Sequence, residues 1–179
     1  MPPPMRGLGL GMLLSIWAAL ALSYACDPPT PDGALVGNFT INATLRSNTC
    51  APGFNPASAT SFAASLHASG ANATWSAGGS SVTGTATGNT IHVVAQSSMT
   101  PYSGCVIDRA ETIDATYVTT PTDSGTPDAG THSATISGTD TITLSTSSGP
   151  PCADVLVVNG GTYPMLPCTA TFDFTGATN

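Results

Sequence analysis

Apolar and polar side chains alternate along the segment FTINATL at residues 39–45, and this alternation indicates the fold class. Phe39, Ile41 and Ala43 fall on one face, and the residues between them are Thr or Asn. Successive side chains of a β-strand point to opposite faces of a sheet, so this period of two predicts a strand with one buried face. Such a strand is typical of an antiparallel sheet that covers a core on one side.

The same alternation recurs along the rest of the chain, in segments separated by turn residues such as Gly78-Gly79 and Gly88-Asn89. The 179 residues include 28 Thr and 19 Ser. Both residue types are poor helix formers, and Thr favours strands. We therefore predict an all-β fold, either a single antiparallel β-sandwich or a small β-barrel of about eight strands.

The first 25 residues are typical of a secretory signal peptide. Arg6 precedes an apolar run from Leu8 to Leu22, and the small residues Ser23 and Ala25 stand three positions and one position before Cys26. The apolar run is shorter than the roughly 20 residues that a membrane-spanning helix needs. We predict that residues 1–25 are removed and that the exported mature chain begins at Cys26.

The segment Ser23-Tyr24-Ala25-Cys26 resembles the lipobox of bacterial lipoprotein precursors, whose Cys becomes a lipidated N-terminus. The resemblance implies that Cys26 is lipidated and that the protein is located in the cell envelope. The lipid anchor at Cys26 would attach it to a membrane. Ser23 stands where a lipobox normally has Leu, and Leu22 is displaced by one position. Ordinary cleavage after Ala25, which would give a soluble periplasmic or secreted protein, is the alternative.

Two segments lack the strand pattern. Residues 26–33 are rich in Pro and predict a tether between the anchor and a β-rich domain at residues 34–179. Residues 119–133 contain two Pro and two Gly but no large apolar side chain. This second segment predicts a flexible loop that projects from the sheet.

The chain has five cysteines, and an odd number leaves one unpaired in an exported protein. Lipidation of Cys26 would leave the others for two disulfides; these are Cys50, Cys105, Cys152 and Cys168. Of the three connectivities, we expect Cys152–Cys168, because these two bracket one short strand and a turn, and hence Cys50–Cys105. The cysteines have no Cys-x-x-Cys spacing, and we predict no metal site.

Arg109 and Glu111 are the candidate ligand-binding residues. They share a strand face with Ile113 if the strand is unbroken, which would place both charges in the interior. There they would form a structural ion pair, or they would be the polar groups of an otherwise apolar ligand cavity. A bulge or turn between Asp108 and Glu111 would instead put both in water.

The composition excludes several classes of function. The chain has no Lys, so neither a P-loop nor Schiff-base catalysis is available. Its basic residues are Arg6, Arg46 and Arg109, too few to bind the phosphates of a nucleic acid. We find no catalytic motif and predict a non-enzymatic protein without a cofactor.

Two roles are compatible with these features. The first is an exported, lipid-anchored envelope protein with a structural or interaction role. The second is a lipocalin-like barrel that carries a small ligand. A cavity of roughly 300 Å³ or more favours the carrier, and a filled interior favours the structural role. We expect a core built from the aromatic residues Phe39, Phe62, Trp75, Phe172 and Phe174.

Overall fold

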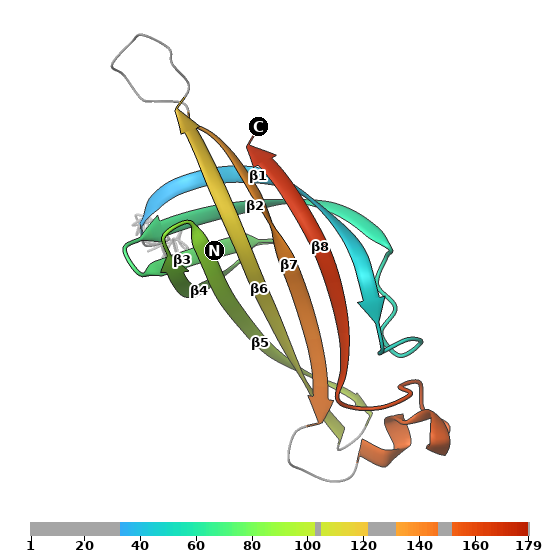
Figure 1. Cartoon of the computed structure of the whole chain (residues 1–179). Coiled ribbons are helices and arrows are strands. Elements are labelled where there is room, and N and C mark those ends of the chain that lie inside the picture. Colours follow the sequence, from blue (N-terminus) through green and yellow to red (C-terminus); the bar gives the residue numbers. More distant parts are fainter. Residues whose placement is uncertain (1–32, 103–104, 122–131, 147–151, 179) are drawn as a thin grey trace, which may run out of the picture. The chain divides into compact units, whose positions relative to one another are not determined.

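The computed structural model (Figure 1) describes residues 33–102, 105–121, 132–146 and 152–178. Its strands are β1 (Ala34–Asn48), β2 (Ala59–Ser69), β3 (Asn72–Ala77), β4 (Ser80–Thr87), β5 (Thr90–Tyr102), β6 (Cys105–Pro121), β7 (His132–Thr146) and β8 (Cys168–Thr178). Two short 3₁₀ helices, η1 (Cys152–Val155) and η2 (Val157–Asn159), precede β8. No helical segment in these ranges has the length and hydropathy to cross a membrane.

Each strand pairs antiparallel with the next, and β8 pairs with β1, so the eight described strands form a closed barrel. The prediction of an all-β fold of about eight strands is confirmed, and of its two alternatives, sandwich and barrel, the barrel is the one observed. The strands differ in length, because β3 and β4 form a short hairpin while β6, β7 and β8 run side by side as long strands (Figure 1). Glycines with positive φ at Gly78, Gly79 and Gly88 make the tight turns on either side of β4, as predicted from the sequence.

Inward-pointing apolar side chains fill much of the barrel. Phe39, Ile41 and Leu66 are almost fully buried, and Trp75 contacts Phe174 with their ring centroids 6.1 Å apart. Four of the five aromatics expected in the core are buried; these are Phe39, Trp75, Phe172 and Phe174.

The prediction that Phe62 belongs to the core is wrong, because its side chain is 38% exposed. Phe62 lies on β2 two residues before Ala64, which is the first β2 residue that pairs with β3. Before Ala64, β2 has a partner in β1 but none in β3. The barrel wall therefore does not cover Phe62 on that side.

The β6 and β7 strands continue into the segment that the sequence predicts as a loop at residues 119–133. Thr119 pairs with Ala134, and Pro121 pairs with His132. The remainder of that segment, residues 122–131, lies outside the described residues. So do the predicted signal peptide, most of the tether, and Cys26.

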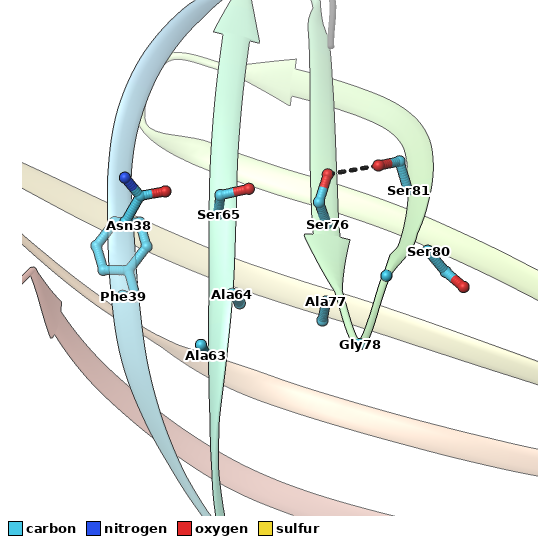
Figure 2. A pocket seen from close by; sticks show the side chains of 11 residues that line it. Asn38, Phe39, Ala63, Ala64, Ser65, Ser76, Ala77, Gly78, Ser80 and Ser81 are labelled. Carbon is cyan, nitrogen blue, oxygen red and sulfur yellow. Dashed lines mark hydrogen bonds between the residues drawn. The ribbon is translucent and has the colours of Figure 1, made fainter. Parts of the chain in front are cut away.

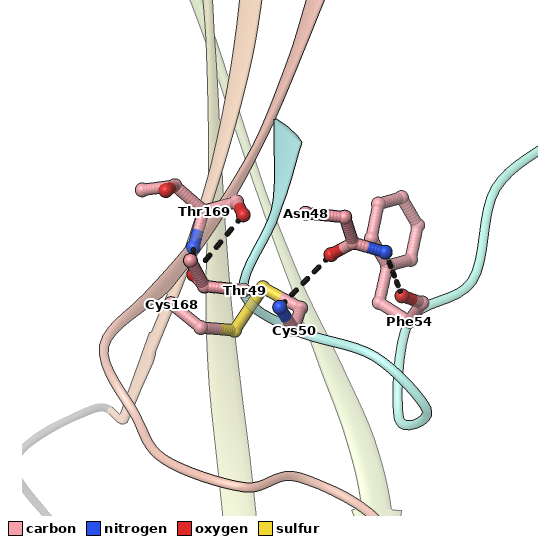
Figure 3. The surroundings of a disulfide bond; sticks show 6 residues. All are labelled: Asn48, Thr49, Cys50, Phe54, Cys168 and Thr169. Atoms are coloured by element: carbon pink, nitrogen blue, oxygen red, sulfur yellow. Dashed lines mark hydrogen bonds between the residues drawn. A yellow bond between two sulfur atoms is a disulfide. The ribbon is translucent and has the colours of Figure 1, made fainter. Parts of the chain in front are cut away.

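Two disulfides lie at one end of the barrel, and their connectivity differs from the expected one. Cys50 is bonded to Cys168 (Figure 3) and Cys105 to Cys152, with Cα–Cα distances of 5.1 and 4.9 Å. The predicted pairs Cys152–Cys168 and Cys50–Cys105 are therefore wrong. The antiparallel β1–β8 register explains the first bond, because Asn48 pairs with Ala170, so that Cys50, two residues after Asn48, meets Cys168, two residues before Ala170.

Hydrogen bonds hold the Cys50–Cys168 bridge in place (Figure 3). The Thr49 N–H donates to the Thr169 carbonyl, and the Thr169 N–H donates to Thr49 Oγ1, both at 2.8 Å. Asn48 accepts from the Cys50 N–H and donates to the Phe54 carbonyl, both at 2.9 Å. The disulfide thus joins two strand ends that backbone pairing has already brought together. Two disulfides in one small domain favour an oxidising compartment.

Candidate binding site

The β6 strand is unbroken between Asp108 and Glu111, where the sequence allowed a bulge or turn as an alternative. Its pairing with β7 runs without interruption from Ile107 to Pro121, and its pairing with β5 is continuous from Ile107 to Thr116. Ile107 and Ile113 are buried on the inner face. Arg109 and Glu111 lie between them in the same parity and therefore face the barrel interior.

Arg109 and Glu111 form an ion pair between Nη2 and Oε2 inside the barrel. Their side chains are 29% and 23% exposed, respectively, so the ion pair is partly buried but still accessible to water. Burial of charge is costly unless opposite charges pair, and these two satisfy that requirement with each other. Of the two alternatives that the sequence left open, the interior ion pair is the one observed, and the exposed placement at a bulge is not.

Asp140 on β7 is a third interior charge, and it was missed in the sequence. It pairs with Ile113 of β6 and lies diagonally across from Glu111, which pairs with Ile142. Its Oδ1 atom is buried and has no hydrogen-bond partner among the described residues. A signal was present, because Asp140 has the same parity as Ile136 and Ile142, both of which are buried.

The surroundings of Asp140 change its protonation. Burial, followed by the nearby Glu111 carboxylate, raises its pKa from 3.8 to about 7, and the Arg109 guanidinium opposes the rise. Asp140 therefore changes charge near neutral pH, next to the Arg109–Glu111 ion pair.

Arg109 and Glu111, but not Asp140, line a cavity of about 360 Å³. We call it the β4–β5 cavity; its lining includes Trp75, Val82, Val93, Ala95, Arg109, Glu111 and Ile113. It forms where β4 and β5 diverge, because these strands pair only from Thr85–His92 to Thr87–Thr90. Close approach at Gly84 marks the start of the divergence, since a Cβ there would lie 2.7 Å from Val93 Cα.

The β4–β5 cavity combines an apolar wall with an ionic one. Trp75 and Val82 come from the β3–β4 hairpin, and Arg109 and Glu111 come from β6. Pockets that hold small molecules commonly have this composition, in which apolar side chains supply affinity and a few polar groups fix orientation. The cavity can therefore accept an amphipathic molecule with its polar end at the ion pair.

A second hollow, of about 490 Å³, lies over the β3–β4 turn and the neighbouring strands β1 and β2 (Figure 2). Asn38, Ser65, Ser76 and Ser81 form one row across four paired strands, and Ser76 and Ser81 are hydrogen-bonded at 2.7 Å. The hollow has no charged lining residue. Small polar side chains on the outer face of a strand are ordinary barrel surface, so this hollow is the weaker candidate.

Other chemistry is sparse in the described ranges. No group of three or more His, Cys, Asp or Glu side chains there is arranged to hold a metal ion. The four described cysteines are consumed by disulfides. No protein-family model matches the chain, and neither the curated proteins nor the solved structures show a significant match to it. The β4–β5 cavity, with Arg109 and Glu111 in its wall, is therefore the candidate functional site.

Proposed function

We propose that this protein is an exported, non-enzymatic carrier or receptor whose barrel binds a small amphipathic molecule in the β4–β5 cavity. The observation that carries the proposal is the cavity itself, about 360 Å³ in volume, with Trp75 on one wall and the Arg109–Glu111 pair on another. Of the two roles expected from the sequence, a cavity above roughly 300 Å³ favours the ligand carrier.

The proposed location is the cell envelope, with a lipid anchor at Cys26. The lipobox-like segment before Cys26 and the Pro-rich tether support this proposal. The two disulfides agree with export, because such bonds persist in oxidising compartments. An anchored barrel would hold its ligand close to a membrane surface.

A structural or interaction role is the second candidate. The outer hollow over β1 to β4 favours it, since a row of Asn and Ser side chains offers both hydrogen-bond donors and acceptors. A partner bound there would leave the β4–β5 cavity unused. The two candidates are therefore separated by substitutions that affect the cavity alone.

The test is binding of a neutral, environment-sensitive fluorophore, N-phenyl-1-naphthylamine, to the purified protein. We expect saturable binding with one site per chain. Ala95→Phe should abolish this binding, because Ala95 lines the cavity and the larger ring fills it. The matched control is Val94→Phe, which adds a ring to the adjacent outward-facing residue of β5 and should leave binding unchanged.

Two results would overturn the carrier role. One is the absence of saturable binding by the folded protein. The other is equal binding by the Ala95→Phe and Val94→Phe variants, because the fluorophore would then sit outside the β4–β5 cavity. Near-ultraviolet circular dichroism of each variant confirms that its barrel is intact.

A further inference from the structure

The interior charges of the barrel do not balance. Of the Asp, Glu and Arg residues on the described strands, Arg109, Glu111 and Asp140 face inward. Arg109 and Glu111 neutralise each other as an ion pair. Asp140 adds a second carboxyl group without a second cation, so the interior has a negative excess whenever Asp140 is ionised.

The negative excess lies next to the β4–β5 cavity, where it would act on a bound ligand. Glu111 lines the β4–β5 cavity, and Asp140 lies beside Glu111 on the neighbouring strand. The buried Oδ1 of Asp140 has no hydrogen-bond partner among the described residues. An unsatisfied buried oxygen is unfavourable, and a positive charge or a hydrogen-bond donor that came close would relieve the cost.

The opposite wall suits the apolar part of a molecule. Trp75 and Val82 face the cavity from the β3–β4 hairpin, with Val93 and Ile113 beside them. Trp75 packs against Phe174, which fixes the orientation of its indole ring. An indole ring attracts both apolar groups and cations, because the face of its π-system is negative.

We propose that the ligand of the β4–β5 cavity is a hydrophobic amine, held with its ammonium group beside Glu111 and Asp140 and its apolar body against Trp75 and Val82. This inference rests on the proposed carrier function and names its ligand class. An organic anion fits less well, since it would compete with Glu111 for Arg109 and would be repelled by Asp140.

The test compares three probes that share an octyl chain and differ in their head groups: octylamine, octanol and octanoate. Binding to the purified protein is measured by titration calorimetry at pH 8. Hydrogen bonds to charged groups are strong, so we expect octylamine to bind at least about tenfold more tightly than octanol. Octanoate should bind most weakly.

These probes distinguish a wrong assignment of the ligand class from a wrong assignment of the carrier function. Equal affinity for the amine and the alcohol, or tighter binding of octanoate, would overturn the amine proposal while leaving the cavity as a binding site. No binding of any of the three would overturn both. If the Ala95→Phe variant binds octylamine as tightly as the original protein does, octylamine binds outside the cavity. That result would also overturn both the amine proposal and the carrier function.

Two isosteric substitutions test the carboxylates separately. Glu111→Gln and Asp140→Asn should each weaken octylamine binding by about tenfold and leave octanol binding unchanged. The matched control is Asp114→Asn, which removes the same charge from the outer face of β6. A preference for the amine that survives both interior substitutions would contradict the proposal.

The pH dependence of the unsubstituted protein gives a measurement that needs no variant. Octylamine remains protonated across this range, whereas Asp140 gains its charge as the pH rises through about 7. The other charged groups facing Asp140 are Glu111 and Arg109, both on β6. The affinity for octylamine should therefore increase between pH 6 and pH 8, while the affinity for octanol stays constant. If both affinities change with pH in the same way, the proposal is wrong.

Discussion

The carboxyl group of Asp140 lies beside that of Glu111 inside the barrel, and this closeness, added to burial, raises the pKa of Asp140 to about 7. The two residues come from neighbouring strands, with Asp140 opposite Ile113 and Glu111 opposite Ile142. Two carboxyl groups this close resist simultaneous ionisation. Glu111 is paired with Arg109, and Asp140 is the carboxyl group whose pKa is raised.

The raised pKa of Asp140 predicts that the fold loses stability as the pH increases. An ordinary carboxyl has a pKa of 3.8, so between about pH 4 and pH 7 the folded state binds a proton that the unfolded state has released. The stabilisation is complete below about pH 4 and is lost as the pH rises through about 7. We expect the free energy of unfolding to fall by a few kcal/mol, at most about 4, over this window.

Asp140→Asn should remove that contribution. The amide carries no charge at any pH, so the variant should be more stable than the unsubstituted protein at pH 8 and similar to it at pH 4. Urea denaturation at a series of pH values measures the difference, with Asp114→Asn as the outer-face control. Profiles of the same slope for the original protein and Asp140→Asn would show that Asp140 does not titrate near neutral pH.

The disulfide connectivity predicts both a peptide map and a stability difference. Digestion without reduction should link Cys50 to Cys168 and Cys105 to Cys152. The sequence separations are 118 and 47 residues, and a longer closed loop restricts the unfolded chain more. Replacing both members of a pair with Ala should therefore cost about 5 kcal/mol for the first bridge and about 4 kcal/mol for the second. A peptide that linked Cys50 to Cys105 would contradict the barrel register.

Trp75 should contribute far more to stability than Phe62. Its side chain is 5% exposed and packs on Phe174, whereas Phe62 is 38% exposed. We expect Trp75→Ala to lower the free energy of unfolding by about 3–5 kcal/mol, and Phe62→Ala to lower it by about 1 kcal/mol or less. In a Trp17→Phe background, where Trp75 is the remaining tryptophan, its emission should be blue-shifted in the folded state. Emission already at long wavelength before denaturation would place the indole in water.

Lipidation predicts that Cys26 alone attaches the protein to membranes. Cys26→Ser should move the protein from the membrane fraction to the soluble fraction, with the barrel still folded, because multiple acyl chains supply the affinity. Ser23→Leu supplies the usual lipobox residue and should leave the protein in the membrane fraction. If Cys26→Ser stays with the membranes, the first 25 residues act as a permanent anchor instead.

The alternation of apolar and polar residues predicts which side chains point inward along most of each strand. Alternation places Phe39 and Ile41 on the buried face. It places Arg109 and Glu111 on the face of Ile113 only if β6 is unbroken, which the sequence left open and the strand pairing shows. These predictions succeed because a period of two is a property of one strand and needs no knowledge of its neighbours. The turns at Gly78-Gly79 and Gly88 are equally local, since they follow from the backbone freedom of glycine.

The way in which the strands meet is visible only in the assembled barrel. Which cysteines pair depends on the β1–β8 register that brings Asn48 opposite Ala170, and residues 118 positions apart in sequence carry no local mark of that contact. The meeting of Asp140 with Glu111 likewise needs the β6–β7 register, and the exposure of Phe62 follows from where β3 begins to cover β2. Pairing between distant strands is set by barrel closure and by the competition among all strand edges, so these properties belong to the assembled fold.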